Sequence, residues 1–237
     1  MQSFCRFAVR CVVAAMLFLP LATLNAQNAV TQTYRAGLRS IAVPAPTGDL
    51  SEIGPDYRVL FEPLAPDTNR LIAAFVLPDD AAAVRGGGVG ALKQYALVEV
   101  MRRAEFSDVS PDLFKQIEDG MATQFGADLN ASLKDQQNEL NHKLKALNDN
   151  AATVSLDKPV QLGALFSKQD ACGFGVIMPV SAKGTTVKMA AGIMVLRVQQ
   201  RLVFAYLYTE YKDDTSVQWM GKTAEAWADS ILAANKP

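Results

Sequence analysis

The sequence predicts an α+β fold in which an antiparallel sheet carries helices on both faces, as in an α/β/α sandwich. The first observation is the segment Arg201–Tyr211, which is largely apolar on both faces of a strand and therefore needs cover on both sides. The second is a pair of amphipathic helices, one from Pro111 and one from Thr215, that can supply the two covers. The third is a series of apolar segments joined by short polar turns, which indicates an antiparallel meander.

Short apolar runs bounded by Pro, Gly or polar turn residues are expected to be the strands. They are Tyr57–Phe61, Arg70–Leu77, Gln94–Arg102, Val160–Phe166, Cys172–Val180, Val187–Val198 and Arg201–Tyr211. Short turns connect the last three, which predicts that they pair antiparallel. Residues 81–91 are small and glycine-rich, and we expect a loop there.

Both long helices have recognisable starts. Ser110 can cap the first, because its side chain accepts hydrogen bonds from free backbone amides and Pro111 has no amide to leave unpaired. Apolar residues then recur every four positions as far as Leu133. For the last helix, Thr215 and Gln218 have the spacing of a capping box.

Residues 134–147 keep the helical pattern but are very polar. Their apolar residues form a thin stripe of Leu140, Leu144 and Leu147. Two interpretations stay open. The stripe belongs to a solvated extension of the helix, or it contacts a partner helix or another copy of the chain.

Residues 1–26 have the features of a secretory signal peptide. Arg6 and Arg10 precede an apolar stretch, and Ala26 offers a small residue before a cleavage site. The alternative is an uncleaved anchor, but the stretch is shorter than the roughly 20 residues of a membrane span and contains Pro20. We therefore expect a periplasmic or secreted chain with no stable membrane insertion after cleavage of the leader.

Two regions are expected behind the leader. Residues 27–48 hold several Pro, Gly, Ser and Thr residues with little apolar periodicity, which predicts a flexible lead. Residues 49–237 are expected to form one α+β domain with a single core. The chain has 23 Lys and Arg against 24 Asp and Glu, and this balance argues against a strongly basic nucleic-acid binder.

Few residues are available for metal or thiol chemistry. Cys172 is the only cysteine outside the leader, so no internal disulfide can form, and its apolar neighbours predict a buried thiol. His142 is the only histidine and lies in the polar helical segment, where we expect it to be exposed. Because zinc sites usually need several Cys or His ligands, we expect neither a metal nor a cofactor.

Glycines after Arg85 formally fit a dinucleotide-binding fingerprint, with Gly86 and Gly88 as its first two positions. The context does not fit, since a long connection separates the preceding strand and the next element is predicted to be another strand. A plain loop is favoured. Arg85, Gly86 and Gly88 can still form an anion-binding concavity.

The hairpin VLRVQQRLVFAYLYTEY is followed by the helical segment QWMGKTAEAWADSILAAN, which contains the step Ser230-Ile231. This stretch, Val195–Asn235, resembles a group of bacterial exported proteins and, more distantly, the end of the PsbP-like α/β/α sandwich. PsbP-like proteins are largely non-enzymatic binding or assembly modules. The resemblance therefore implies a binding role and brings no catalytic motif.

Three functions are compatible with these patterns. The leading one is an exported, soluble, non-enzymatic module that binds a protein or a small ligand in the cell envelope. The second is an envelope hydrolase that uses carboxylates or a lone serine, which needs titratable groups gathered in one cleft. The third is a membrane-associated assembly factor, held by an uncleaved leader or by the polar helix.

Overall fold

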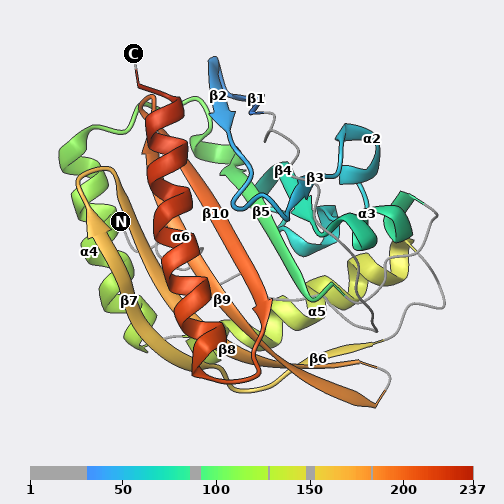
Figure 1. The fold of residues 1–237 in the computed structure, drawn as a ribbon. Coiled ribbons are helices and arrows are strands. Elements are labelled where there is room, and N and C mark those ends of the chain that lie inside the picture. Colours follow the sequence, from blue (N-terminus) through green and yellow to red (C-terminus); the bar gives the residue numbers. More distant parts are fainter. Residues whose placement is uncertain (1–30, 86–91, 128, 148–152, 183, 237) are drawn as a thin grey trace.

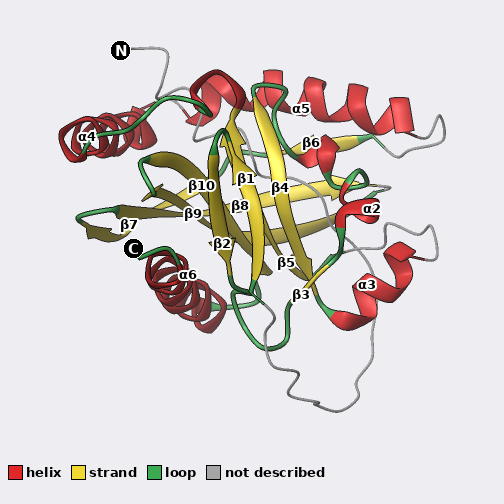
Figure 2. Ribbon diagram, turned by 90° about the horizontal axis from the view of Figure 1, so that it is seen from above, coloured by secondary structure: helices red, strands yellow, loops and turns green. Residues whose placement is uncertain are grey.

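The computed structural model describes residues 31–85, 92–127, 129–147, 153–182 and 184–236. Within these residues the centre is an eight-stranded antiparallel sheet in the order β3-β4-β5-β10-β9-β8-β6, and β7 pairs with the same edge of β8 as β6 (Figure 1). Helices α4 and α5 lie on one side of this sheet and α6 on the other (Figure 2). The predicted α+β fold with helices on both faces is confirmed.

The strands are β1 Gln32–Ala36, β2 Arg39–Val43, β3 Ser51–Glu52, β4 Asn69–Val76, β5 Gln94–Met101, β6 Val154–Leu156, β7 Val160–Lys168, β8 Ala171–Ala182, β9 Thr185–Val198 and β10 Arg201–Glu210. The helices are α2 Pro55–Arg58, α3 Pro78–Arg85, α4 Pro111–Ala127, α5 Leu129–Leu147 and α6 Asp214–Ala234, with short 3-10 turns at η1 Glu62–Leu64 and η2 Arg102–Ala104.

Strand β10 separates two apolar layers, as its sequence predicts. Val203 and Leu207 point to the side of α6 and share a core with Trp227. Phe204 and Tyr206 point to the opposite side and share a core with residues of α4 and α5. None of these five side chains exposes more than 2% of its surface. Burial on both faces therefore accounts for the double apolar pattern of this strand.

The two long helices start close to their predicted positions. Ser110 caps α4 by accepting a hydrogen bond from the backbone N–H of Leu113 at 3.1 Å. The cap predicted for α6 was wrong by two residues, because Asp213 and not Thr215 occupies that position. Its carboxylate accepts from the N–H of Thr215 at 2.9 Å. A carboxylate at this position also compensates the positive end of the helix.

The prediction of a flexible lead at 27–48 was wrong for residues 32–43. These residues form the antiparallel hairpin β1–β2, whose buried side chains Tyr34, Ile41 and Val43 belong to the core on the α6 side. Each strand has only five residues with a polar outer face, so the apolar alternation was too short to recognise. The folded domain therefore begins before residue 49.

Two local predictions were also wrong. Residues 57–61 are not a strand: α2 covers Tyr57 and a turn follows, since Pro55 opens a helix directly after Gly54, whose φ is 90°. The loop predicted at 81–91 is helical as far as Arg85, the last residue of α3. Pro78, Asp79 and Asp80 form its first turn, a favourable set of residues for a helix start.

Candidate functional site

One end of the molecule brings together turns from distant parts of the sequence. It is formed by the β1–β2 turn at 37–38, the segment 102–110 after β5, the β7–β8 turn at 169–170, the β9–β10 turn at 199–200 and the residues that follow α6. We call it the hairpin end, and it lies at the top of Figure 1.

A pocket of about 680 Å³ opens at the hairpin end. Two other hollows among the described residues measure about 360 and 260 Å³. The large pocket is lined by the cations Arg39, Arg197 and Lys236 and by one carboxylate, Asp170. Three positive charges and one negative charge give its lining a formal charge of +2. The pocket therefore has the electrostatics of an anion-binding site.

Arg197 and Asp170 form the fixed part of the pocket wall. The Nε atom of Arg197 lies 2.7 Å from Oδ1 of Asp170, and the backbone N–H of Arg197 donates to the carbonyl of Asp170 at 2.8 Å. These contacts hold the β7–β8 turn against the end of β9. Since one carboxylate already neutralises Arg197, the excess charge of the pocket comes from Arg39 and Lys236.

Asn235 joins the two backbone segments that carry those cations. Its side-chain amide donates to the carbonyl of Ala42 at 2.7 Å and accepts from the N–H of Ala42 at 2.8 Å. This pairing attaches the residue after α6 to strand β2. Arg39 begins that strand, and Lys236 follows Asn235, so both are held at the rim of the same pocket.

The β9–β10 turn also lines the pocket. Gln199 and Gln200 have φ angles of 47° and 67°, a conformation that costs a non-glycine residue about 1 kcal/mol or more. A two-residue hairpin turn requires such angles. The carbonyl of Gln200 accepts from the N–H of Val109 at 2.8 Å, and both glutamines line the pocket. Glutamine here places two amide groups, each a donor and an acceptor, beside the cations.

The predicted site residues lie elsewhere. Arg85 ends α3, whereas Gly86 and Gly88 lie outside the described residues. Leu140 exposes only 6% of its surface in the core beneath α5, and Leu144 packs against the same core. Both residues therefore attach α5 to its own sheet, and Leu144 keeps an intermediate exposure. Leu147 ends α5.

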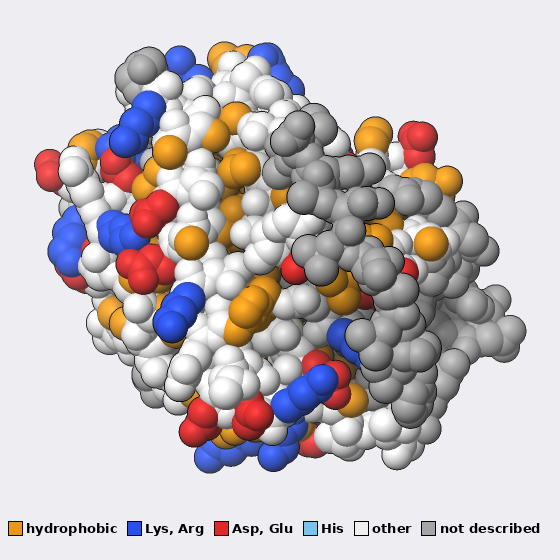
Figure 3. Space-filling model, in the orientation of Figure 1, with side chains coloured by type: hydrophobic (Ala, Val, Ile, Leu, Met, Phe, Trp, Pro, Cys, Tyr) orange, Lys and Arg blue, Asp and Glu red, His pale blue; other side chains and the backbone are white. Residues whose placement is uncertain are grey.

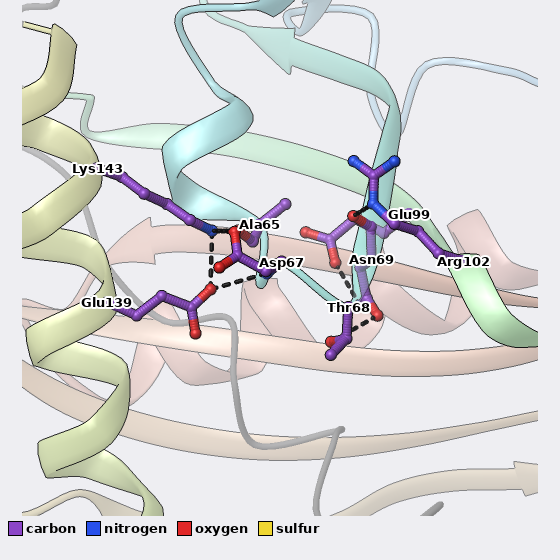
Figure 4. Close-up of polar contacts among 8 residues, drawn as sticks. All are labelled: Ala65, Asp67, Thr68, Asn69, Glu99, Arg102, Glu139 and Lys143. Carbon is purple, nitrogen blue, oxygen red and sulfur yellow. Dashed lines mark hydrogen bonds and ion pairs between the residues drawn. The ribbon is translucent and has the colours of Figure 1, made fainter.

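A polar cluster attaches α5 to the chain before β4 (Figure 4). The Nζ atom of Lys143 donates to the carbonyl of Ala65 at 2.7 Å and lies 2.8 Å from the carboxylates of Asp67 and Glu139. Burial alone lowers the pKa of Lys143, but the hydrogen bonds to Asp67 and Glu139 outweigh it and raise the pKa. All three of its donors are satisfied, so this ammonium group acts as a structural clamp.

Beneath the clamp, Glu99 projects from β5 and exposes none of its surface. Its Oε2 accepts a hydrogen bond from Nδ2 of Asn69 at 2.8 Å, and Arg102 donates from Nε to the backbone carbonyl of Asn69 at 2.9 Å (Figure 4). This pairing connects the adjoining ends of β4 and β5.

A second buried carboxylate connects α4 to the edge of the sheet. Glu118 accepts a hydrogen bond from the hydroxyl of Ser167 on β7 and lies 3.1 Å from Nζ of Lys115. Cys172 lies in the same region and exposes only 1% of its surface, which confirms its predicted burial. Burial, with a smaller contribution from the charge of Glu118, raises the pKa of the Cys172 thiol to about 12.

His142 is exposed on α5. Within the described ranges, no group of three or more His, Cys, Asp and Glu side chains is arranged to hold a metal ion. The helices of these ranges include none that is both long and apolar enough to cross a membrane.

The anion pocket was missed from the sequence alone. Its cations stand at positions 39, 197 and 236, and the first of them lies in the segment taken for a flexible lead. The only available signal was the short alternation of Gln32–Ala36 and Arg39–Val43 around Gly37.

Comparisons with known proteins assign no family to the chain. No protein-family model and no curated protein matches the chain. Among solved structures, the chain is similar to the Ran-binding protein Mog1p of Saccharomyces cerevisiae, with 11% identity, coverage of 86% of this chain and 91% of that chain, and a TM-score of 0.25. A mutant of Mog1 gives 12% identity, coverage of 86% and 93%, and a TM-score of 0.27.

Proposed function

We propose that the chain is an exported, non-enzymatic binding module of the cell envelope and that it binds an anionic ligand in the pocket at the hairpin end. The observation that carries this proposal is the convergence of Arg39, Arg197 and Lys236 on one pocket with a single carboxylate. Export is supported by the leader-like residues 1–26.

The three cations do not contribute equally to anion binding. Asp170 neutralises Arg197. Lys236 stands just past the end of α6, where the negative end of the helix offsets part of its charge. Arg39 is exposed and faces the pocket from β2. A guanidinium can bind a phosphate or carboxylate group through two parallel hydrogen bonds, so Arg39 should be the principal contact.

Inorganic phosphate is a suitable first probe, because it carries the charge and acceptor oxygens of most biological anions. We expect phosphate to raise the melting temperature of the purified protein above that in sodium chloride of equal ionic strength, since a ligand that binds only the folded state stabilises it. Arg39→Gln should remove this gain. Lys222→Gln, on the exposed face of α6, should retain it. Equal stabilisation of all three proteins, or none of the wild type, would contradict the proposal.

A hydrolase remains the second candidate because of one contact. The hydroxyl of Ser167 donates to the buried carboxylate of Glu118, as an activated serine nucleophile must donate to its base. The same contact also serves to attach α4 to β7. Turnover of activated esters by the wild type that disappears in Ser167→Ala, with unchanged thermal stability, would favour the hydrolase over the binding module.

A further inference from the structure

The two most exposed large apolar side chains among the described residues lie on neighbouring turns. Leu38 exposes 72% of its surface at the tip of the β1–β2 hairpin, and Phe106 exposes 66% after η2. The turns touch at Gly37, whose N–H donates to Oε1 of Glu105 at 2.9 Å. A β-carbon on Gly37 would collide with the carbonyl of Glu105 and approach Cα of Phe106 to 3.2 Å. The two apolar tips are therefore adjacent.

Arg70 on β4 holds both turns in place. Its guanidinium forms two hydrogen bonds with the carboxylate of Glu105, and its Nη2 also donates to the backbone carbonyl of Arg35 at 2.8 Å. This one arginine therefore connects the segment that carries Phe106 to the strand that leads to Leu38. The exposed side chains are presented on a fixed base, and little entropy is lost when they bind.

Exposed arginines stand close to both tips in the sequence. Arg39 follows Leu38 directly, Arg35 stands three residues before it, and Arg103 stands three residues before Phe106. Lys and Arg side chains are visible across this end of the molecule (Figure 3). We call the set Arg35, Leu38, Arg39, Arg103 and Phe106 the tip surface.

Most acidic groups at the hairpin end are already paired with arginines. Glu105 pairs with Arg70, Asp108 pairs with Arg201, and Asp170 pairs with Arg197. Asp112, in the first turn of α4, contributes an opposing charge. The tip surface is therefore cationic, and charge complementarity calls for an anionic occupant.

We propose that the tip surface docks on an anionic phospholipid bilayer, with Leu38 and Phe106 entering the boundary between headgroups and acyl chains and the arginines contacting lipid phosphates. Two neighbouring apolar side chains that protrude between cations suit a bilayer, which accepts them without a shaped pocket. A protein partner would be better served by a larger apolar patch than two side chains provide. This inference rests on the proposed function, since Arg39 belongs to both the anion pocket and the tip surface.

The test is flotation of the exported protein with lipid vesicles. The chain is expressed with its own leader, the exported form is purified without detergent, and mass spectrometry establishes its first residue. Vesicles of phosphatidylethanolamine with about 30% phosphatidylglycerol are compared with vesicles of phosphatidylcholine alone. The first mixture is anionic and should attract a basic surface, whereas the second carries no net charge. We expect at least about tenfold stronger partitioning onto the anionic vesicles, and weakening in high salt.

Matched variants distinguish binding through the apolar tips from nonspecific adsorption to the vesicles. Leu38→Ser with Phe106→Ser should reduce partitioning at least about tenfold, because two large apolar groups no longer leave water. Arg35→Gln should reduce it about fivefold through the loss of one charge. Val160→Ser is the control, since Val160 exposes 57% of its surface on the edge strand β7. It should bind as the wild type does, and melting curves should show that all variants are folded.

Several outcomes would overturn the inference. Equal binding to neutral and anionic vesicles, or unchanged binding of the Leu38→Ser, Phe106→Ser variant, would exclude docking through the tip surface. Absence of vesicle binding would leave a protein partner as the occupant. If phosphate stabilises the protein but the protein does not bind vesicles, the membrane inference fails and the proposed function stands. If vesicles bind but phosphate has no effect on stability, the proposed pocket function fails instead.

Discussion

Asn235 pairs with Ala42 through both groups of its side-chain amide, at 2.7 Å to the carbonyl and 2.8 Å to the N–H. The two residues are 193 positions apart. One amide therefore joins the end of the last helix to the first hairpin, and it does so at the rim of the anion pocket.

Removal of this amide should destabilise the fold. Asn235→Ala leaves a backbone N–H and a carbonyl of β2 without their partner, and we expect a loss of about 1–3 kcal/mol in the free energy of unfolding. Urea denaturation measures this loss. Lys236→Ala, one residue later and exposed, should change the free energy by less than about 0.5 kcal/mol. Equal effects of the two substitutions would show that the amide pairing carries no stability.

Gly37 should not tolerate a side chain. Its φ is 57°, and an added β-carbon would collide with the carbonyl of Glu105, so Gly37→Ala should cost at least about 2 kcal/mol. Gly48→Ala is the matched control, because a β-carbon there meets no atom within 4 Å. It should change the free energy of unfolding by less than about 0.5 kcal/mol. A tolerated Gly37→Ala would mean that the β1–β2 turn does not pack on the segment after η2.

The ion pair of Glu105 predicts a pH dependence of stability. Burial raises the pKa of this carboxyl, but the hydrogen bonds from Arg70 and from the N–H of Gly37 outweigh it and hold the pKa below its ordinary value of 4.5. A pKa that is lower in the folded state contributes stability above the unfolded value and loses it as the pH falls through the folded value.

Wild type and Glu105→Gln should therefore differ in the free energy of unfolding at pH 7, and the difference should shrink below pH about 4.5. Chemical denaturation at pH about 7 and again below pH about 4.5 measures this difference in the free energy of unfolding. In an Arg70→Gln background the effect of Glu105→Gln should be much smaller, since the principal partner is gone. A difference that grows on acidification would contradict the pairing.

Cys172 should react only after the protein opens. Its thiol is 1% exposed and its pKa is raised to about 12 by burial, so little thiolate forms and no reagent reaches it. Labelling with a disulfide reagent at pH about 8 should be slow in the native protein and fast in urea. Rapid labelling of the native protein would show that the sheet edge beneath α4 is open.

The sheet was largely predictable because its central strands are long and doubly apolar. Strand β10 has core residues on both faces. Short turns separate it and the two apolar segments that precede it in the sequence. The covering helices were predictable from Pro111 and from the polar segment near Thr215, although the cap of α6 is Asp213, two residues before the predicted one. A short strand such as β6, with three residues, gives no such signal.

The candidate site was not predictable for a physical reason. Arg39, Arg197 and Lys236 meet only because β2 pairs with Asn235 and α6 packs across the sheet. Such contacts depend on tertiary packing, which periodicity does not encode. The glycine-rich segment after Arg85 suggested an anion-binding site because its motif consists of consecutive residues. Leu140 likewise suggested a partner contact, because the sheet beneath α5 is distant in sequence.

The most direct test of the central claim is a titration of the isotopically labelled protein with inorganic phosphate, followed by amide nuclear magnetic resonance. We predict shifts concentrated at Arg39, Arg197 and Lys236 and at the side-chain amides of Gln199 and Gln200, all of which line the pocket. These shifts should saturate in the wild type and vanish in Arg39→Gln. Shifts spread evenly over surface lysines and arginines, or centred away from the hairpin end, would contradict the account.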